Sequence, residues 1–253
     1  MTTLAILQAR MTSTRMPGKV LAPLAGRPSI LRQIERIQRA SRLDGIVVAT
    51  SSDSSDDVLV EVLEAEGIAV VRGPMDDVLA RFILAMDEHQ PTAVVRLTAD
   101  CPLTSPVVID EVIEHFWATG ADYASNTMKP TYPDGLDVEV VKAQVLREVA
   151  AESTDPPERE HVTLGVYRRH DRYRIENVVG KQDLSDLRWT VDTPEDYRFV
   201  SEVYDALYEA SPGFDIDEIL DYLRQHPGRS RTVQDAARNA ALKGLPAGAM
   251  ESP

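Results

Sequence analysis

The chain is predicted to fold as an α/β protein in which a mostly parallel β-sheet lies between two layers of helices. Within the first hundred residues, four short apolar or β-branched runs alternate with stretches whose apolar residues recur at helical spacing. This alternation is typical of parallel strands joined by crossover helices. Right-handed crossovers place the loops that follow the strands at one edge of the sheet, where α/β proteins bind ligands.

Local patterns place the elements of this first part. The helix after the first strand carries Ile30 and Ile34 on one face, with charged residues between them. Ser29 is its expected N-cap, and Asp76 or Asp77 is expected to start the third helix, because short polar side chains accept hydrogen bonds from first-turn N–H groups. The strands are expected at 4–7, 46–50, 68–71 and 93–97, and the helices at 29–43, 57–67 and 78–89.

From residue 105 onward the alternation becomes less regular. Ser105 and Pro106 open a helical stretch, since serine caps helices and proline is favoured in their first turn. We expect one domain over residues 1–230, with an inserted element at 123–187, and a tail at 231–253 that is partly disordered. Strands are expected at 122–126, 136–141, 174–179 and 189–191, and helices at 107–120, 142–152, 159–170, 194–210 and 215–225.

The composition excludes several classes of protein. The 253 residues are 43% hydrophobic and carry a formal net charge of −14, which disfavours general nucleic-acid binding through a basic face. Cys101 is the only cysteine, so neither an internal disulfide nor a cysteine-based metal cluster can form within one chain. No apolar run approaches the roughly 18 residues of a membrane span, and the first residues lack the pattern of a secretory leader. A cytoplasmic protein with no nucleic-acid or membrane partner is therefore expected.

The loop after the first predicted strand is basic although the chain is acidic. It contains Arg10, Arg15 and Lys19 together with several small hydroxyl side chains and a glycine. Such a loop can direct N–H groups and cations toward a polyphosphate, with arginine gripping two oxygens and lysine acting as a point charge. A solvated surface loop is the alternative, but cations concentrated in an acidic chain favour the polyphosphate. The spacing matches neither the P-loop nor the dinucleotide-binding turn.

Two aspartates directly follow predicted strands. Asp100 comes after the strand at 93–97, and Asp192 comes after the strand at 189–191. Both are therefore expected at the same edge of the sheet as the basic loop. Magnesium commonly takes one or two protein carboxylates together with substrate phosphates and water, so the pair predicts a Mg²⁺ site. The alternatives are a helix N-cap for Asp192 and a turn for Asp100.

Several motifs resemble one family. The stretch QARMTSTRMPGKVL at 8–21 resembles the signature of the cytidylyltransferase family, which contains the CMP-sialic acid and CMP-Kdo synthetases, and most closely its spore-coat polysaccharide branch. Thr12 departs from that pattern, which has glycine there. The resemblance implies a three-layer, Rossmann-like fold of the nucleotide-diphospho-sugar transferase type. Further matches, in the family's order, are VATS at 48–51, RG at 72–73, DDVLAR at 76–81, RLTADCPL at 96–103, YPDGLDVEV at 132–140, EREHVT at 158–163 and RWTVDTPED at 188–196.

The resemblance also implies a reaction. Members of the family use CTP and Mg²⁺ to join CMP to a small anionic acceptor, such as a sugar acid or a phosphonate, and release pyrophosphate. The preference for cytosine comes from the resemblance alone. Carried over to this chain, it implies catalytic roles for Arg15, Lys19, Asp100 and Asp192, triphosphate contacts from Arg10, Ser13, Arg15 and Lys19, Mg²⁺ ligation by Asp100 and Asp192, base contacts from Ala9, Arg10 and Thr50, and further nucleotide contacts from Arg72, Arg81 and Thr98.

The inserted element is expected to hold the acceptor and, because relatives use similar elements to pair subunits, to form a homodimer. For Asp134 the alternative is an ordinary turn with Gly135. For His161 the alternative is a histidine that ends a helix or lies in the core. The acceptor candidates are Tyr132, Asp134, Asp137, Glu139, Arg159 and His161.

Two other functions are compatible with the same fold. A glycosyltransferase that uses a sugar nucleotide in polysaccharide biosynthesis usually places an Asp-x-Asp metal motif after a middle strand. Here that pattern occurs only at 215–217, where it reads as a helix cap. A binding module without activity is disfavoured because Arg15, Lys19, Asp100 and Asp192 are all present.

Overall fold

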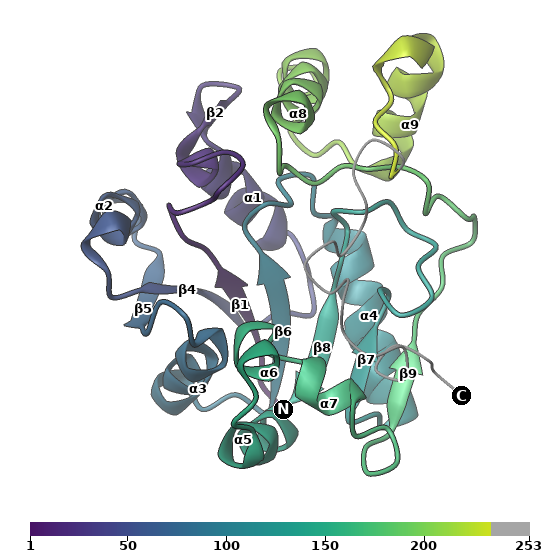
Figure 1. The fold of residues 1–253 in the computed structure, drawn as a ribbon. Coiled ribbons are helices and arrows are strands. Elements are labelled where there is room, and N and C mark those ends of the chain that lie inside the picture. The colour runs from purple at the N-terminus through teal and green to yellow at the C-terminus, as the bar shows by residue number, and fades with distance from the viewer. Residues whose placement is uncertain (234–253) are drawn as a thin grey trace.

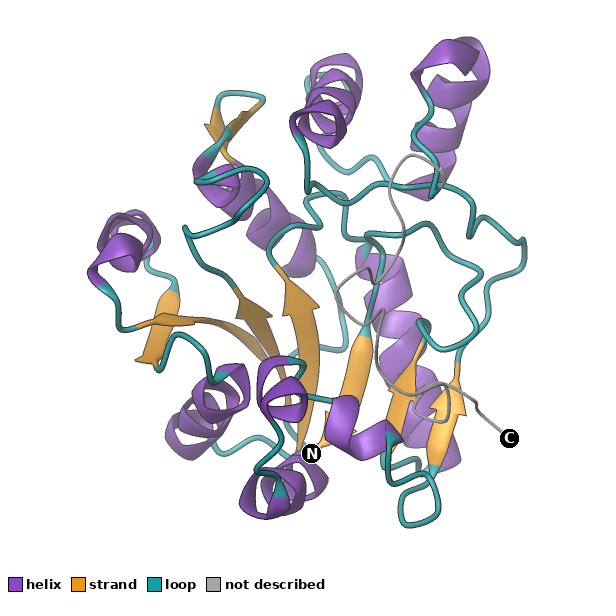
Figure 2. Ribbon diagram, viewed as in Figure 1, coloured by secondary structure: helices purple, strands orange, loops and turns teal. Residues whose placement is uncertain are grey.

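The computed structural model describes residues 1–233 and has a seven-stranded sheet in the order β5-β4-β1-β6-β8-β7-β9, with helices on both faces (Figures 1 and 2). The predicted three-layer α/β fold is therefore confirmed. Most of the tail predicted at 231–253 lies outside the described residues. The strands are β1 (Thr3–Gln8), β4 (Gly45–Ser51), β5 (Ala69–Gly73), β6 (Ala93–Thr98), β7 (Tyr123–Ser125), β8 (Glu139–Lys142) and β9 (Ile175–Asn177), and a small hairpin is formed by β2 (Pro23–Leu24) and β3 (Arg27–Pro28).

The sheet is mostly parallel, as predicted. Strands β5, β4, β1 and β6 run parallel to one another, and β9 runs parallel to β7. Strand β8 is antiparallel to both of its neighbours, β6 and β7. The segment at 123–187, predicted as an inserted element, thus contributes three strands to the main sheet.

Two apolar cores lie on opposite faces of the sheet, because side chains alternate along each strand. In β1, Ala5 and Leu7 pack against the helices of one face, and Leu4 and Ile6 pack against those of the other. The first face is covered by α1 (Ser29–Ile37), α2 (Asp57–Ala65), α4 (Pro106–Thr119), α8 (Pro194–Leu207) and α9 (Ile216–Gln225), and the second by α3 (Val78–His89), α5 (Ala143–Glu152), α6 (Pro156–Glu160) and α7 (Leu164–Tyr167). Short 3₁₀ turns are η1 (Lys19–Leu21), η2 (Ser54–Asp56) and η3 (Pro227–Arg229).

Helix starts confirm three of the predicted caps and correct a fourth. Asp215, predicted as a cap, forms a capping box with Glu218 at the start of α9. Asp77 accepts from the N–H of α3's first turn, and Ser105 does so for α4. Ser29 is not a cap: the N-cap of α1 is Pro28, with no side-chain hydrogen bond, and Ser29 is the first helical residue.

Two predicted elements have a different form in the structure. The helix expected at 159–170 is divided into α6 and α7, because Val162 adopts a positive φ of 45° that an α-helix cannot accommodate. The segment at 189–191, predicted as a strand, is not part of the sheet. Its N–H groups donate to two loops instead: Trp189 to the carbonyl of Asp134 over 2.6 Å and Val191 to that of Asp100 over 2.7 Å.

No helix in residues 1–233 combines the length and the apolar character needed to cross a membrane.

Candidate active site

A cavity of about 460 Å³ opens at the carboxyl edge of the parallel strands. The ends of β1 and β6 and the loops that follow them form its floor, and α3 and the α6–α7 turn form one wall. The cavity is thus at the edge that strand order predicts for ligands. Ten of the predicted site residues line it: Ala9, Arg10, Ser13, Arg15, Lys19, Arg81, Thr98, Asp100, His161 and Asp192.

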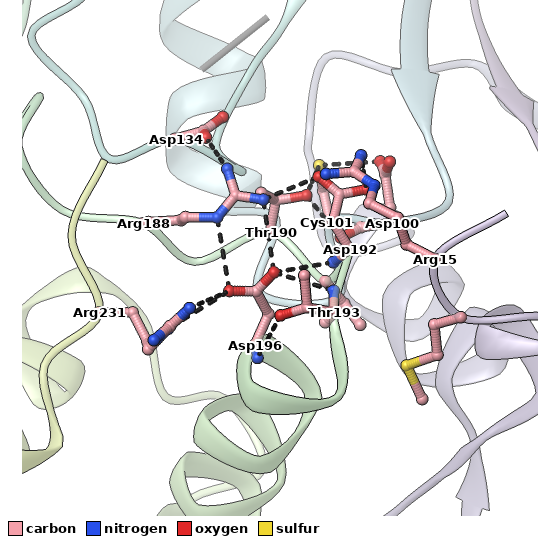
Figure 3. Close-up of polar contacts among 12 residues, drawn as sticks. Arg15, Asp100, Cys101, Asp134, Arg188, Thr190, Asp192, Thr193, Asp196 and Arg231 are labelled. Atoms are coloured by element: carbon pink, nitrogen blue, oxygen red, sulfur yellow. Dashed lines mark hydrogen bonds and ion pairs between the residues drawn. The ribbon is translucent and has the colours of Figure 1, made fainter. Parts of the chain in front are cut away.

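At one end of the cavity, Lys19 lies between the two predicted aspartates. Its ammonium group is 3.3 Å from Oδ2 of Asp100 and 3.0 Å from Oδ1 of Asp192, and it donates to the carbonyl of Val191 over 2.7 Å. Arg15 pairs with the same Oδ1 of Asp192 at 2.9 Å (Figure 3). Cations of the basic loop and the carboxylates of both predicted aspartates therefore meet at one point.

The electrostatics of this cluster favour the charged forms. Burial alone would lower the pKa of Lys19, but the carboxylates of Asp100 and Asp192 raise that pKa above its ordinary value. Burial would raise the pKa of Asp100, yet the Lys19 ammonium holds it below its ordinary value. The ammonium and carboxylate are thus both ionised at neutral pH.

Asp192 is not a helix cap, which corrects one alternative from the sequence. Thr193 caps α8, and its partner in the capping box is Asp196, whose side chain accepts from the Thr193 N–H. Both carboxylate oxygens of Asp192 therefore remain available for side-chain partners.

The basic loop is folded back on itself. Gly18 takes a φ of 72°, where glycine is favoured, and donates its N–H to the carbonyl of Met11 over 2.9 Å. Met11 in turn donates to the buried carboxylate of Asp56 over 2.7 Å. Thr50 was predicted to contact the nucleotide base, but it does not line the cavity. Its hydroxyl also donates to Asp56, so Thr50 supports the loop indirectly through that carboxylate.

Arg81, on α3, is buried without hydrogen-bond partners for two of its nitrogens. It is only 2% exposed, and its Nε and Nη1 find no acceptor among residues 1–233. Burial and the neighbouring Arg10 guanidinium lower the pKa of Arg81. A buried charge left unpaired is costly, and here it lines the cavity beside a second cation. The arrangement suits an anionic or carbonyl-bearing ligand.

Gln8 was not among the predicted site residues, but it lines the cavity. Its side-chain oxygen accepts from Nε of Arg96 over 3.1 Å, and Arg96 pairs with Glu139 at 2.7 Å. A guanidinium only donates, so the oxygen of the Gln8 amide faces Arg96 and the nitrogen does not. Within the described part of the chain that nitrogen makes no hydrogen bond. The signal that could have identified Gln8 was its place at the end of the first strand, immediately before the basic loop.

Asp76 and Glu160 also line the cavity without having been predicted to do so. The sequence predicted Asp76 as a possible helix start and as part of the motif at 76–81, and Glu160 as part of the motif at 158–163. Their places in these matched motifs were the available signal.

Six further predicted residues lie outside the cavity. Arg72 contacts the carbonyls of Ser51 and Asp53 and pairs with Asp57. Four of the remaining five make polar contacts with other side chains of the protein: Tyr132 donates to Glu111, Asp134 pairs with Arg188, Glu139 pairs with Arg96, and Arg159 pairs with Asp77. The fifth, Asp137, does not line the cavity.

The donor set fits a hard divalent cation. Within residues 1–233 no group of three or more histidine, cysteine or acidic side chains could hold a metal. Two carboxylates do converge, and Mg²⁺ is commonly held by one or two carboxylates together with substrate phosphates and water.

Known proteins resemble this chain in sequence and in fold. A family model described as cytidylyltransferase matches residues 4–228. The spore coat polysaccharide biosynthesis protein SpsF of Bacillus subtilis is 32% identical over 231 residues, covering 88% of this chain and 95% of that protein. A 3-deoxy-manno-octulosonate cytidylyltransferase of Anaeromyxobacter dehalogenans is 37% identical over 152 residues, covering 59% of each chain. The solved structure of a cytidylyltransferase from Leptospira borgpetersenii has a TM-score of 0.85 at 26% identity, covering 90% of this chain and 96% of that one.

The family match includes both the basic loop and the two aspartates that meet at Lys19. With the fold, the motifs and the relatives in agreement, the chain belongs to the cytidylyltransferase family.

Proposed function

We propose that this protein joins CMP from CTP to a small anionic acceptor and releases pyrophosphate, with Mg²⁺ as cofactor. One observation carries the proposal: a single cavity gathers four cationic side chains and two carboxylates that converge on one of them, Lys19. The cations suit a triphosphate, and the carboxylates suit the cation that accompanies it.

In this proposal the basic loop binds the triphosphate. Arg10, Ser13 and Arg15 contact the phosphate oxygens, and Arg81 supplies a further positive charge from the α3 wall. Lys19 leaves its ion pairs with the aspartates and stabilises the charge that develops on the departing pyrophosphate. An oxygen of the acceptor attacks the α-phosphorus, and the bond between the α-phosphorus and the oxygen bridging to the β-phosphate breaks.

Asp100 and Asp192 would hold the Mg²⁺. The ion supplies charge neutralisation and orientation of the α-phosphate when it is bound. Two backbone contacts of Val191 determine where that happens. Its N–H donates to the main-chain carbonyl of Asp100, and its own carbonyl accepts from Lys19, so the segments that carry the two aspartates are joined to each other and to the ammonium.

The acceptor is proposed to be a sugar acid or a phosphonate-like molecule. Support comes from the relative that acts on 3-deoxy-manno-octulosonate and from the relative named for spore coat polysaccharide biosynthesis. His161 is the acceptor candidate that lines the cavity, so we assign the acceptor to the wall formed by the α6–α7 turn. We also propose a homodimer, which light scattering of the purified protein would test.

Pyrophosphate release tests the proposed function. Each of the four NTPs is supplied with Mg²⁺ across a panel of sugar acids, phosphonates and neutral sugars. Release from CTP alone, dependent on an acidic acceptor, is the expected result. UDP release from a UDP-sugar would instead indicate a glycosyltransferase, and CTP binding without turnover on any acceptor would indicate a binding module.

A further inference from the structure

The two oxygens of the Asp192 carboxylate have different partners. Oδ1 faces the cavity and accepts from Arg15 at 2.9 Å and Lys19 at 3.0 Å. Oδ2 faces away from it and accepts from Nη2 of Arg188 at 2.7 Å (Figure 3). Because Arg188 binds Oδ2, the Asp192 carboxylate cannot rotate without breaking a charge-assisted hydrogen bond.

Arg188 is itself fixed from several sides. Its side chain is 2% exposed, and Nη1 donates to Asp134 over 2.6 Å. Nε and Nη2 each lie 3.4 Å from one oxygen of Asp196. The planar guanidinium therefore spans three carboxylates, a geometry that a lysine ammonium cannot reproduce.

Asp196 links this support to the backbone of the site. Its Oδ2 accepts from the N–H of Asp192 at 3.1 Å and from that of Thr193 at 3.0 Å. Its Oδ1 lies 3.2 Å from Arg231, which comes from the end of the described chain. Asp196 thus holds the main chain of Asp192 while Arg188 holds its side chain, as Figure 3 shows.

Gly135 lets the Asp134 loop approach closely enough to reach Arg188. It has a φ of 108°, and a Cβ there would lie 2.6 Å from the backbone nitrogen of Thr190. The Asp134-Gly135 pair is therefore more than a surface turn, because it packs directly on the segment that carries Arg188 and Asp192.

We infer that Arg188 is a positioning residue for Asp192: it binds Oδ2 and so keeps Oδ1 directed at Lys19 and at the metal position of the proposed function, on which this inference rests. Groups that support a metal ligand from behind commonly affect metal affinity or activity by about 10- to 100-fold. Arg188 makes no contact with the cavity and touches no reacting atom in this assignment.

The test compares Arg188→Lys with wild type in the full chain. Mn²⁺ binding is measured by electron paramagnetic resonance in the presence of a CTP analogue whose α–β bridge cannot be cleaved. The Mg²⁺ concentration for half-maximal turnover is measured separately. We expect Mn²⁺ binding at least about 10-fold weaker and a matching increase in the Mg²⁺ requirement, with most of the rate recovered at high Mg²⁺.

Two further variants keep the result interpretable. Arg32→Lys changes another buried, ion-paired arginine away from the cavity and should bind Mn²⁺ like wild type. Asp134→Asn loosens Arg188 from its far side and should show a smaller shift in the same direction, which carries the test if Arg188→Lys does not fold.

The outcomes separate this inference from the proposed function. Folded Arg188→Lys or Asp134→Asn protein that binds Mn²⁺ as tightly as Arg32→Lys overturns the positioning role alone. Wild-type protein that binds Mn²⁺ with the analogue but never turns over CTP overturns the proposed function alone. Wild-type protein that takes up no Mn²⁺ with the analogue overturns the positioning role and the metal site together.

Discussion

Arg96 donates from Nε to the side-chain oxygen of Gln8 across 3.1 Å, and this bond fixes which end of the Gln8 amide is left for the cavity. The free end is an NH₂ group, a donor to a phosphate, carboxylate or carbonyl oxygen of the substrate. Gln8→Glu replaces that donor with a negative oxygen while keeping the bond to Arg96. We expect KM for CTP or for the acceptor to rise about 10-fold or more, the scale of losing a hydrogen bond to a charged group.

Steady-state kinetics with each substrate varied in turn would check the Gln8 prediction. Gln144→Glu, on α5 beside Glu148, makes the same chemical change away from the cavity and should leave both KM values as in wild type. Unchanged KM values in Gln8→Glu would remove Gln8 from substrate recognition.

Lys19 and Asp100 are expected to act in the chemical step. Lys19→Ala or Asp100→Asn should lower kcat by at least about 10²-fold, the scale of losing one electrostatic catalyst. The measurement is turnover at saturating CTP, acceptor and Mg²⁺. Arg27→Ala removes an exposed ion pair with Glu66 and provides the control for loss of a basic side chain. A rate near that of wild type in either variant would exclude that residue from the mechanism.

The convergence of Lys19 with Asp100 and Asp192 could be predicted from the sequence. Lys19 and Asp192 are 173 residues apart, yet Lys19 lies in the loop that follows β1, and Asp192 directly follows the segment predicted as a strand at 189–191. Parallel topology brings such positions to one edge, so the pattern of strands was sufficient to bring them together. The Asp192 segment reaches that edge without being a strand of the sheet, because loop carbonyls take its N–H groups.

The direction of individual side chains could not be predicted in the same way. Glu139 was expected at the acceptor because it lies in a matched motif, but the alternation of β8 turns it inward to Arg96. Arg159 was expected there too, but it reaches across to Asp77 at the start of α3. These outcomes depend on the partner that each buried charge finds in the folded chain, which local pattern does not contain.

Arg81 is predicted to lower the stability of the ligand-free protein and to contribute to the binding of CTP. Arg81→Met keeps an unbranched side chain of similar length and removes a buried charge with two unpaired nitrogens. We expect the ligand-free variant to melt at the same temperature as wild type or higher. Its stabilisation by CTP with Mg²⁺ should be largely lost, because that stabilisation depends on affinity.

Thermal unfolding with and without CTP and Mg²⁺ would test the Arg81 prediction. Arg32→Met is the matched control: Arg32 is also buried, but its guanidinium contacts the carbonyl of Leu24 and the carboxylate of Glu35. It should melt lower and keep the ligand-induced shift. An Arg81→Met variant that melts lower and keeps that shift would indicate a purely structural role.

His161 is expected to make stability depend on pH. Burial lowers the pKa of His161, with Arg96 adding to the decrease and Glu160 opposing it. In the unfolded chain the imidazole titrates near its ordinary pKa of about 6.5. Between the lowered pKa and about 6.5, the unfolded state therefore binds more protons than the folded state. The free energy of unfolding rises with pH across that window, and above it the contribution of His161 is constant.

Urea unfolding from pH 5 to 8 should show this rise in wild type and a smaller rise in His161→Gln. His170→Gln, which removes an exposed histidine, is the control for the loss of one imidazole. Parallel curves for wild type and His161→Gln would show that the cavity does not disfavour the charged imidazole.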